Sequence, residues 1–150
     1  TPAPAGLRKG LIAATFTPMQ DDGALALDRV PAIVAHLERQ GVRGVFVCGS
    51  TGEGASLTTR ERMDAAAAFA TACAGRLPVI VHVGHNCLAD AGMLAAHAHE
   101  IGVDAIAAAP PSYYPLGRGA DAATATFKER ELCHLTSSSL PCGRYTRRGT

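Results

Sequence analysis

The chain has 150 residues, of which 47% are hydrophobic, and this is enough to bury a core within a single domain. Its formal net charge is +1 and it contains no long run of Lys or Arg, so a nucleic-acid partner is not expected. The apolar stretches are shorter than the roughly 20 residues that cross a bilayer, and the first residues lack a signal-peptide pattern, so we expect no membrane association and a cytoplasmic location.

The first expected elements are a strand and a helix. Residues 10–17 are apolar almost throughout and end at Pro18, which predicts a strand buried on both faces. After a turn, apolar residues recur at the spacing of one helical face, at Val30, Ile33, Val34 and Leu37. Asp28 is predicted to be the N-cap of this helix, and Gly41 is predicted to close it.

The same alternation of strand and helix then repeats. Residues 44–48 predict a second strand, and a loop over residues 49–57 follows it. A helix is expected to begin at the capping box formed by Thr58 and Glu61 and to run to about Cys73. A third strand over 79–83, a helix over 88–100 and a fourth strand over 105–109 complete the series.

Tandem strand-helix units of about 30 residues imply parallel strands joined by right-handed crossovers, because parallel neighbours need a long return path. A doubly wound open sheet and a (β/α)8 barrel both fit this α/β pattern. From Gly117 onward Ser, Thr, Arg and Gly dominate, so residues 117–150 are expected to be a divergent tail, weakly helical and then irregular. Because four strands leave two free sheet edges, the chain is expected to dimerise, to aggregate or to be only partly ordered in solution.

The cysteines and histidines do not predict a metal centre. The five cysteines are odd in number and widely spaced, without a Cys-x-x-Cys pair: Cys48, Cys73, Cys87, Cys133 and Cys142. His82 and His85 lack an evident third ligand, and zinc sites normally use three or four. Reduced thiols are therefore expected, and neither a metal ion nor another cofactor is.

The loop GSTGEG, residues 49–54, carries the candidate chemistry. It follows a strand expected to be parallel, and ligands bind at the carboxyl ends of such strands. The hydroxyl groups of Ser50 and Thr51, together with free loop amides, are suited to a carboxylate or phosphate oxygen. The loop has no lysine and the wrong glycine spacing for the Walker and dinucleotide patterns, and Glu53 would repel a polyphosphate. A plain strand-to-helix turn, with Glu53 bonded to a neighbouring loop, stays open as an alternative.

Five segments resemble, in order and with sensible gaps, the N-acetylneuraminate lyase and dihydrodipicolinate synthase family. They are GLIAATFTPM (10–19), GVFVCGSTGEGASL (44–57), IVHVG (80–84), AHAHEIGVDAIA (96–107) and PPSYYP (110–115). The resemblance runs from about Leu7 to Leu116 and is stronger to the lyase branch. It implies that residues 1–116 are the N-terminal half of a (β/α)8 barrel.

The resemblance also implies an activity and a set of site residues. Members of this family bind pyruvate or another 2-oxo acid as a Schiff base on a lysine, and the lyase branch cleaves N-acetylneuraminate to N-acetylmannosamine and pyruvate. Ser50, Thr51 and Gly52 match substrate-binding positions, and Ser50 also matches a member of the proton relay. Tyr113 matches a catalytic tyrosine that reaches an adjoining subunit, with packing at the rim as its alternative. A homotetramer without a cofactor is implied.

The chain departs from the family in one respect. The family's Schiff-base lysine and main catalytic tyrosine lie on later strands, and the only lysines here, Lys9 and Lys128, lie outside every expected strand. The 150 residues are therefore expected to be a truncated form that lacks turnover. Two alternatives stay open: a dihydrodipicolinate synthase-like or other 2-oxo-acid aldolase, and a non-catalytic product that associates with full-length subunits.

Overall fold

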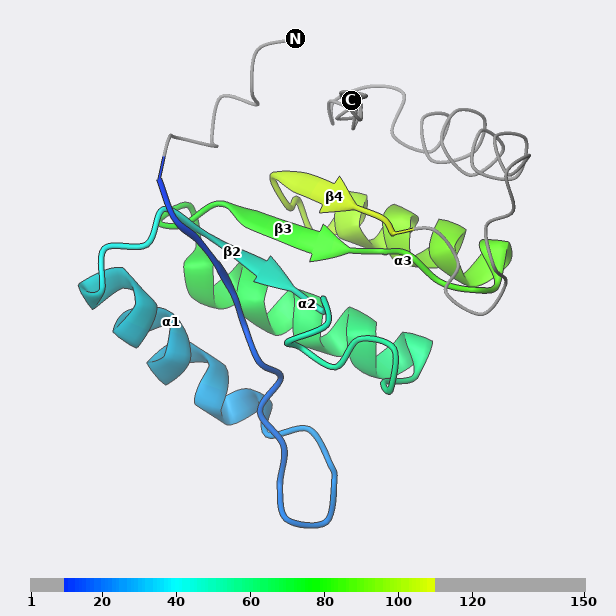
Figure 1. Cartoon of the computed structure of the whole chain (residues 1–150), viewed down its shortest axis with the longest axis horizontal. Coiled ribbons are helices and arrows are strands. Elements are labelled where there is room, and N and C mark those ends of the chain that lie inside the picture. The colour runs from blue at the N-terminus through cyan, green and yellow to red at the C-terminus, as the bar shows by residue number, and fades with distance from the viewer. Residues whose placement is uncertain (1–9, 110–150) are drawn as a thin grey trace, which may run out of the picture.

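The computed structural model describes residues 10–109; residues 1–9 and 110–150 lie outside the described part. Strands and helices alternate along it, as Figure 1 shows: β1 (Ile12–Ala14), the short 3-10 helix η1 (Leu27–Arg29), α1 (Val30–Arg39), β2 (Gly44–Val47), α2 (Thr59–Cys73), β3 (Val79–His82), α3 (Leu88–Glu100) and β4 (Ala105–Ala107). The predicted order of elements is confirmed, although each strand is shorter than predicted. Between residues 10 and 109, no helix has the length and apolar character needed to span a membrane.

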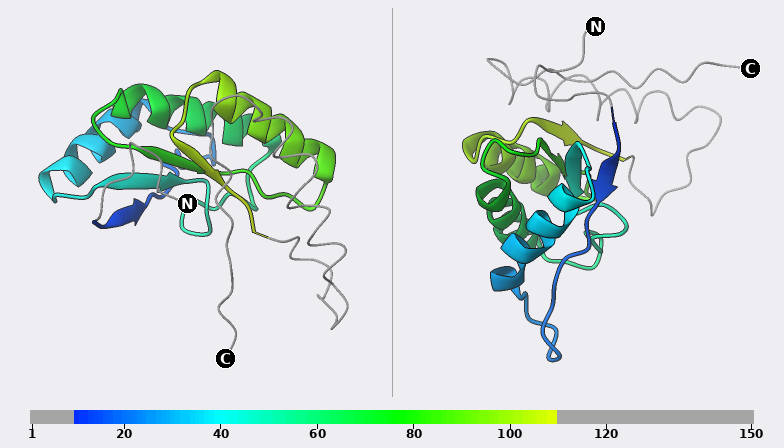
Figure 2. Two further views of the ribbon diagram at one scale, coloured as in Figure 1. Left: turned by 90° about the horizontal axis from the view of Figure 1, so that it is seen from above. Right: turned by 90° about the vertical axis from the view of Figure 1, so that its left-hand side faces the viewer.

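The four strands form one parallel sheet in the order β1-β2-β3-β4, so each strand pairs with the one that precedes it in the chain. The helices α1, α2 and α3 provide the long return paths that parallel pairing needs. Figure 2 shows all three helices on the same face of the sheet. A doubly wound sheet carries helices on both faces, so the arrangement favours the winding of a barrel.

The core lies between this covered face and the helices. Val45 and Val47 of β2 are completely buried, whereas Phe46, which lies between them and points to the other face, is only partly buried. Leu11 and Phe16, which flank β1, are 70% and 53% exposed. The prediction that the first strand is buried on both faces is therefore wrong for the described residues, because helices cover only one of them.

The start of α1 also differs from the prediction. Asp28 lies inside η1, and the N-cap of α1 is Arg29, whose side chain makes no capping hydrogen bond. The reason is that η1 runs directly into α1, so the chain is already helical where a separate cap was expected. Pro31 in the first turn has no backbone N–H that needs a partner.

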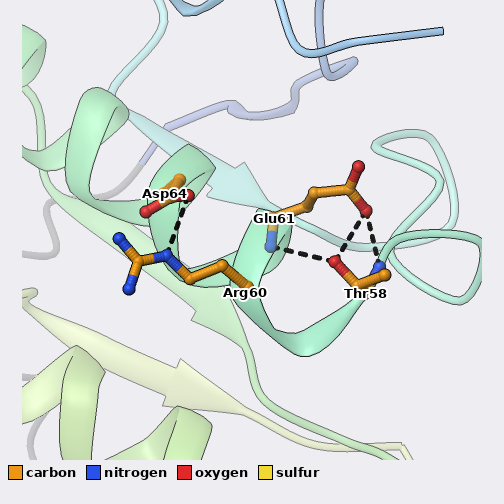
Figure 3. Close-up of polar contacts among 4 residues, drawn as sticks. All are labelled: Thr58, Arg60, Glu61 and Asp64. Carbon is orange, nitrogen blue, oxygen red and sulfur yellow. Dashed lines mark hydrogen bonds and ion pairs between the residues drawn. The ribbon is translucent and has the colours of Figure 1, made fainter.

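The capping box at the start of α2 is confirmed (Figure 3). The Glu61 backbone N–H donates to Thr58 Oγ1 at 3.2 Å, and the Thr58 backbone N–H donates to the Glu61 carboxylate at 2.8 Å. These bonds fix the point at which the chain leaves the preceding loop and enters the helix. The other end of α2 turns through Ala74 and Gly75, which both have positive φ angles of 36° and 74°.

Candidate functional site

The Gly49–Gly54 loop lies at the edge of the sheet where the strands end. It directly follows β2 and Cys48, while β1 leads into Thr15 and Thr17 and β3 ends at His82. Because all four strands are parallel, their carboxyl ends share this edge. Residues that are far apart in the sequence therefore surround the loop.

The loop is closed by its own backbone hydrogen bonds. Glu53 N–H donates to Ser50 O and Gly54 N–H donates to Gly49 O, both at 3.1 Å. Cys48 and Glu53 have φ angles of 59° and 53°, a left-handed conformation that costs a non-glycine residue on the order of 1–3 kcal/mol. The surrounding contacts must hold this shape, and the result is a turn in which Ser50 and Thr51 are exposed.

Two glycines of the loop pack against the strands too closely for a side chain. A Cβ atom on Gly52 would lie 3.0 Å from Thr15 O and 3.1 Å from Cys48 N, and a Cβ on Gly54 would collide with Cys48 O. The glycines therefore let the loop fold back onto the ends of β1 and β2. Gly52 itself is buried, and it shapes the loop that carries Ser50 and Thr51.

Buried threonines after β1 anchor the loop. The Thr17 hydroxyl donates to Gly52 O at 2.7 Å, and the Thr15 hydroxyl donates to Phe46 O at 3.3 Å. Both threonines are at most 5% exposed, so these bonds are shielded from water. Thr17, which follows β1, thus anchors the loop that follows the neighbouring strand β2.

Arg62 of α2 connects the ends of β2 and β3 behind the loop. Its side chain is only 2% exposed, and its Nη1 and Nη2 atoms donate to Gly84 O at 3.0 Å and His82 O at 2.6 Å. The Cys48 thiol donates to the Arg62 backbone carbonyl at 3.7 Å. The Nε atom of Arg62 is buried, and no group in the described part of the chain accepts a hydrogen bond from it.

The surroundings of His82 favour its neutral form. Nδ1 lies 3.4 Å from Arg62 Nη2, and Nε2 accepts the backbone N–H of Ala109 at 3.1 Å. A protonated ring would carry a hydrogen on each nitrogen, and these hydrogens would face the N–H groups of Arg62 and Ala109, which are themselves donors. Burial lowers the pKa of His82, and the charge of Arg62 lowers that pKa further.

Cys48 is chemically quiet at neutral pH. Burial raises the pKa of its thiol to about 11, and the nearby Arg62 offsets only part of that effect. A thiol with so high a pKa is a poor nucleophile, because the reactive form is the thiolate. Burial also lowers the pKa of Arg62 from its ordinary value.

The structure brings together three of the four site residues predicted from sequence. Ser50, Thr51 and Gly52 form one turn at the carboxyl edge of the sheet, with the two hydroxyl-bearing residues exposed and the glycine buried. Tyr113 lies outside the described residues. The alternative role of Glu53, a bond to a neighbouring loop, is not seen among residues 10–109: its carboxylate is exposed, and its backbone bonds stay within the loop and the turn that follows.

The two histidines considered as metal ligands have separate partners. His82 faces Arg62, whereas His85 Nδ1 accepts the Cys87 N–H at 2.9 Å and lies 3.5 Å from the Asp90 carboxylate. Within the described residues, no group of three His, Cys, Asp or Glu side chains is placed to hold a metal ion.

The sequence interpretation missed the residues that support the loop. Thr15 and Thr17 were treated only as part of a strand, although a polar side chain in a nearly apolar run is a signal that it has a buried partner. Arg62 had a clearer signal, because it shares the helical spacing of Ala65, Ala66 and Phe69 and therefore belongs to the buried face of α2.

Comparison with known proteins agrees with this geometry. The model of the dihydrodipicolinate synthetase family matches residues 7–120. The chain belongs to the dihydrodipicolinate synthetase family. Its fold is accordingly that of the (β/α)8 barrels of this family, and the described residues supply four of the strands.

Individual relatives within the family include named lyases. N-acetylneuraminate lyase of Danio rerio is 48% identical over 107 residues, which are 70% of this chain and 35% of that protein. The structure of Proteus mirabilis N-acetylneuraminate lyase superposes with a TM-score of 0.79 at 32% identity, over 86% of this chain and 43% of the other. The chain thus spans little more than a third of the curated relative.

One solved family member is named as a complex with pyruvate. It is a prophage protein of the dihydrodipicolinic acid synthase family from E. coli K12, and it superposes with a TM-score of 0.80 at 27% identity, over 88% of this chain and 42% of that one.

Proposed function

We propose that the chain supplies the carboxylate-binding part of a class I aldolase that cleaves N-acetylneuraminate to N-acetylmannosamine and pyruvate through a Schiff base. The observation that supports this most directly is the Gly49–Gly54 loop, which presents two exposed hydroxyl groups at the carboxyl ends of parallel strands. The relatives named as N-acetylneuraminate lyases support the choice of substrate.

The chemistry of the loop suits a small carboxylate. Ser50 and Thr51 can each donate a hydrogen bond to a carboxylate oxygen, and bonds to a charged acceptor are stronger than bonds between neutral groups. The Glu53 carboxylate is exposed on the same turn, so a ligand with several phosphate charges would be repelled. A single carboxylate can approach the hydroxyl groups while staying clear of Glu53.

Within this proposal Ser50 has two roles and Tyr113 has one. Ser50 binds the carboxylate and takes part in the proton relay, while Tyr113 completes the site of an adjoining subunit in a homo-oligomer, which we propose to be a tetramer. Neither Lys9 nor Lys128 stands at the position of the family's Schiff-base lysine, so we expect the 150-residue chain to bind pyruvate without forming a covalent adduct.

A second 2-oxo-acid aldolase activity, such as that of a dihydrodipicolinate synthase, is the alternative. The loop binds the part of the substrate that these enzymes share, and it therefore does not distinguish them.

The proposal is tested by titrating the chain with pyruvate and following its backbone amide signals by NMR. We expect shifts in residues 49–54 with pyruvate, and none with pyruvamide, which lacks the negative charge. Replacing both hydroxyl residues (Ser50→Ala with Thr51→Val) should weaken binding about tenfold or more, because two bonds to a charged group are lost. Ser56→Ala, an exposed serine beyond the loop, is the matched control.

Two further results bear on the proposal. Borohydride reduction with pyruvate, followed by intact-mass measurement, should show an unmodified chain; an adduct on Lys9 or Lys128 would contradict the expected absence of a Schiff base. If the chain is folded but pyruvate does not shift the amide signals of residues 49–54, the carboxylate site itself is refuted.

A further inference from the structure

Among residues 10–109, Arg62 is the one buried residue with a charged side chain, and the fold alone does not explain its presence. It lies on the inner face of α2, together with Ala65, Ala66 and Phe69, where an apolar residue would pack. Within residues 10–109 no carboxylate pairs with it; the ion pairs there are Arg60–Asp64, Arg76–Glu38 and His85–Asp90. A buried charge without a counter-ion is strongly unfavourable, so it is seldom kept without a role.

The guanidinium group is held by backbone carbonyl groups. Its two terminal nitrogens donate to the oxygens of His82 and Gly84, which continue the chain at the end of β3. Carbonyl oxygens stabilise the cation but do not cancel its charge. The chain is closely packed at Gly84, because a Cβ there would lie 2.9 Å from His82 Nε2 and 3.0 Å from Ala109 N.

The positive charge lies next to the start of the Gly49–Gly54 loop. Cys48, the residue before the loop, donates its thiol to the backbone carbonyl of Arg62. The nearby guanidinium of Arg62 offsets part of the rise that burial causes in the pKa of this thiol. Among residues 10–109, the polar groups that face the guanidinium are the His82 ring and carbonyl, the Gly84 carbonyl and the Cys48 thiol. No negative charge among them neutralises it.

We propose that Arg62 is a positioning residue for carboxylate binding: its buried, unpaired positive charge draws a ligand carboxylate to the Ser50 and Thr51 hydroxyl groups without touching the ligand. This inference rests on the proposed function of the loop and extends it to a residue on α2. It accounts for both features of the side chain, which has no carboxylate partner among residues 10–109 and is anchored to the end of β3.

Two substitutions separate the charge of Arg62 from its packing. Arg62→Met keeps most of the side-chain length but removes the charge, whereas Arg62→Lys keeps the charge but loses the two-pronged hydrogen bonding. Arg60→Met removes an equal charge from the exposed side of the same helix, where Arg60 is 83% exposed, and is the control. Arg62→Gln, whose amide can still donate to the carbonyl groups, replaces Arg62→Met if that variant does not fold.

The readout is the dissociation constant for pyruvate, measured from the amide shifts of residues 49–54. We expect Arg62→Met to weaken binding about tenfold, because the buried charge is lost. Arg62→Lys, which keeps the charge, should stay within about threefold of the unsubstituted chain. Arg60→Met should do the same, because the surface charge that it removes is screened by solvent. Equal weakening by Arg62→Lys and Arg62→Met would mean that only packing matters, and this result would overturn the inference.

A second readout does not depend on a ligand. The ring signals of His82 follow its protonation, and removing the neighbouring positive charge should raise the pKa of His82 in Arg62→Met but not in Arg60→Met. If pyruvate does not shift the amide signals of residues 49–54 in the unsubstituted chain, the proposed function fails. If the pKa of His82 nevertheless rises in Arg62→Met as expected, the position of the Arg62 charge beside His82 is still supported. An unchanged His82 titration in Arg62→Met would overturn the inference directly.

Discussion

The helix-covered face of the sheet and its carboxyl edge are stabilised by different interactions. On the covered face, apolar side chains such as Val47 and Phe69 are completely buried against one another. At the carboxyl edge, polar groups are buried instead, and each is held by a specific bond, as Thr17 is to Gly52 and Arg62 to Gly84. The comparison indicates that the helix-covered face provides most of the stability of the fold. At the carboxyl edge, part of that stability offsets the cost of burying the polar groups that hold the loop in shape.

The largest expected effect tests the covered face. Phe69→Ala removes a completely buried aromatic side chain from the core, and we expect it to lower the free energy of unfolding by about 3–5 kcal/mol in urea titrations. Met93→Ala is the control, because Met93 is 50% exposed and its loss should have little effect. Equal losses for the two variants would contradict the position of the core.

The next effect belongs to the carboxyl edge. Thr17→Val keeps the shape of the side chain but leaves Gly52 O without its buried hydroxyl donor, and we expect a loss of about 1–3 kcal/mol with faster hydrogen exchange in residues 49–54. Thr15→Val is the matched control. Phe46 O retains the backbone N–H of Thr15 at 3.0 Å, so this second substitution should be milder.

A smaller effect is expected where the loop enters α2. Thr58→Ala removes the side-chain cap of the helix and should cost about 1 kcal/mol in unfolding free energy. Thr71→Ala, an exposed threonine within the same helix, controls for the change of residue type. Thr71→Ala should be neutral or slightly stabilising, because alanine has the higher helix propensity. A similar loss in both variants would contradict the role of the cap.

The capping box should also give a pH dependence. Hydrogen bonds from the backbone and side chain of Thr58 lower the pKa of Glu61 from its ordinary value of 4.5. A carboxylate with a lowered pKa stabilises the fold above pH 4.5, and this contribution is lost as the pH falls through the lower pKa of the folded state. Glu61→Gln should therefore lose less stability than the unsubstituted chain on acidification through this range, as followed by urea unfolding.

The smallest effect is expected on the solvent side of α2. Arg60 and Asp64 form an ion pair at 3.1 Å, four residues apart, as Figure 3 shows. The side chains are 83% and 40% exposed, so a double-mutant cycle with alanine should give only about 0.3–0.5 kcal/mol, decreasing with added salt. A coupling above about 1 kcal/mol would show that this surface is less open to solvent than the structure indicates.

The covered face was largely predictable from the sequence. The spacing of Val30, Ile33, Val34 and Leu37 identifies the buried side of α1, and the pair of Thr58 and Glu61 identifies the start of α2. These signals are local, because helical periodicity and capping depend on residues three or four positions apart. The error at Asp28 arose because η1 replaces a separate cap, which the residue type alone does not reveal.

The carboxyl edge was predictable only in part. The turn that contains Ser50, Thr51 and Gly52 was predictable because these residues are consecutive and follow a strand. Thr17 and Arg62 were not, because their partners lie 35 and 22 residues away and become neighbours only after the strands pair. A sequence pattern shows that such a polar residue is unusual for its position, whereas the fold shows what it binds.

The order of the sheet has a consequence for how this region is made. Because each strand pairs with the one synthesised just before it, the nascent chain can add β2, β3 and β4 in turn without waiting for a distant segment. The loop can be fastened to Thr17 as soon as α2 has emerged from the ribosome. The bond from Arg62 to Gly84 forms only when Gly84 follows, so the carboxyl edge of the sheet is completed in two stages during translation.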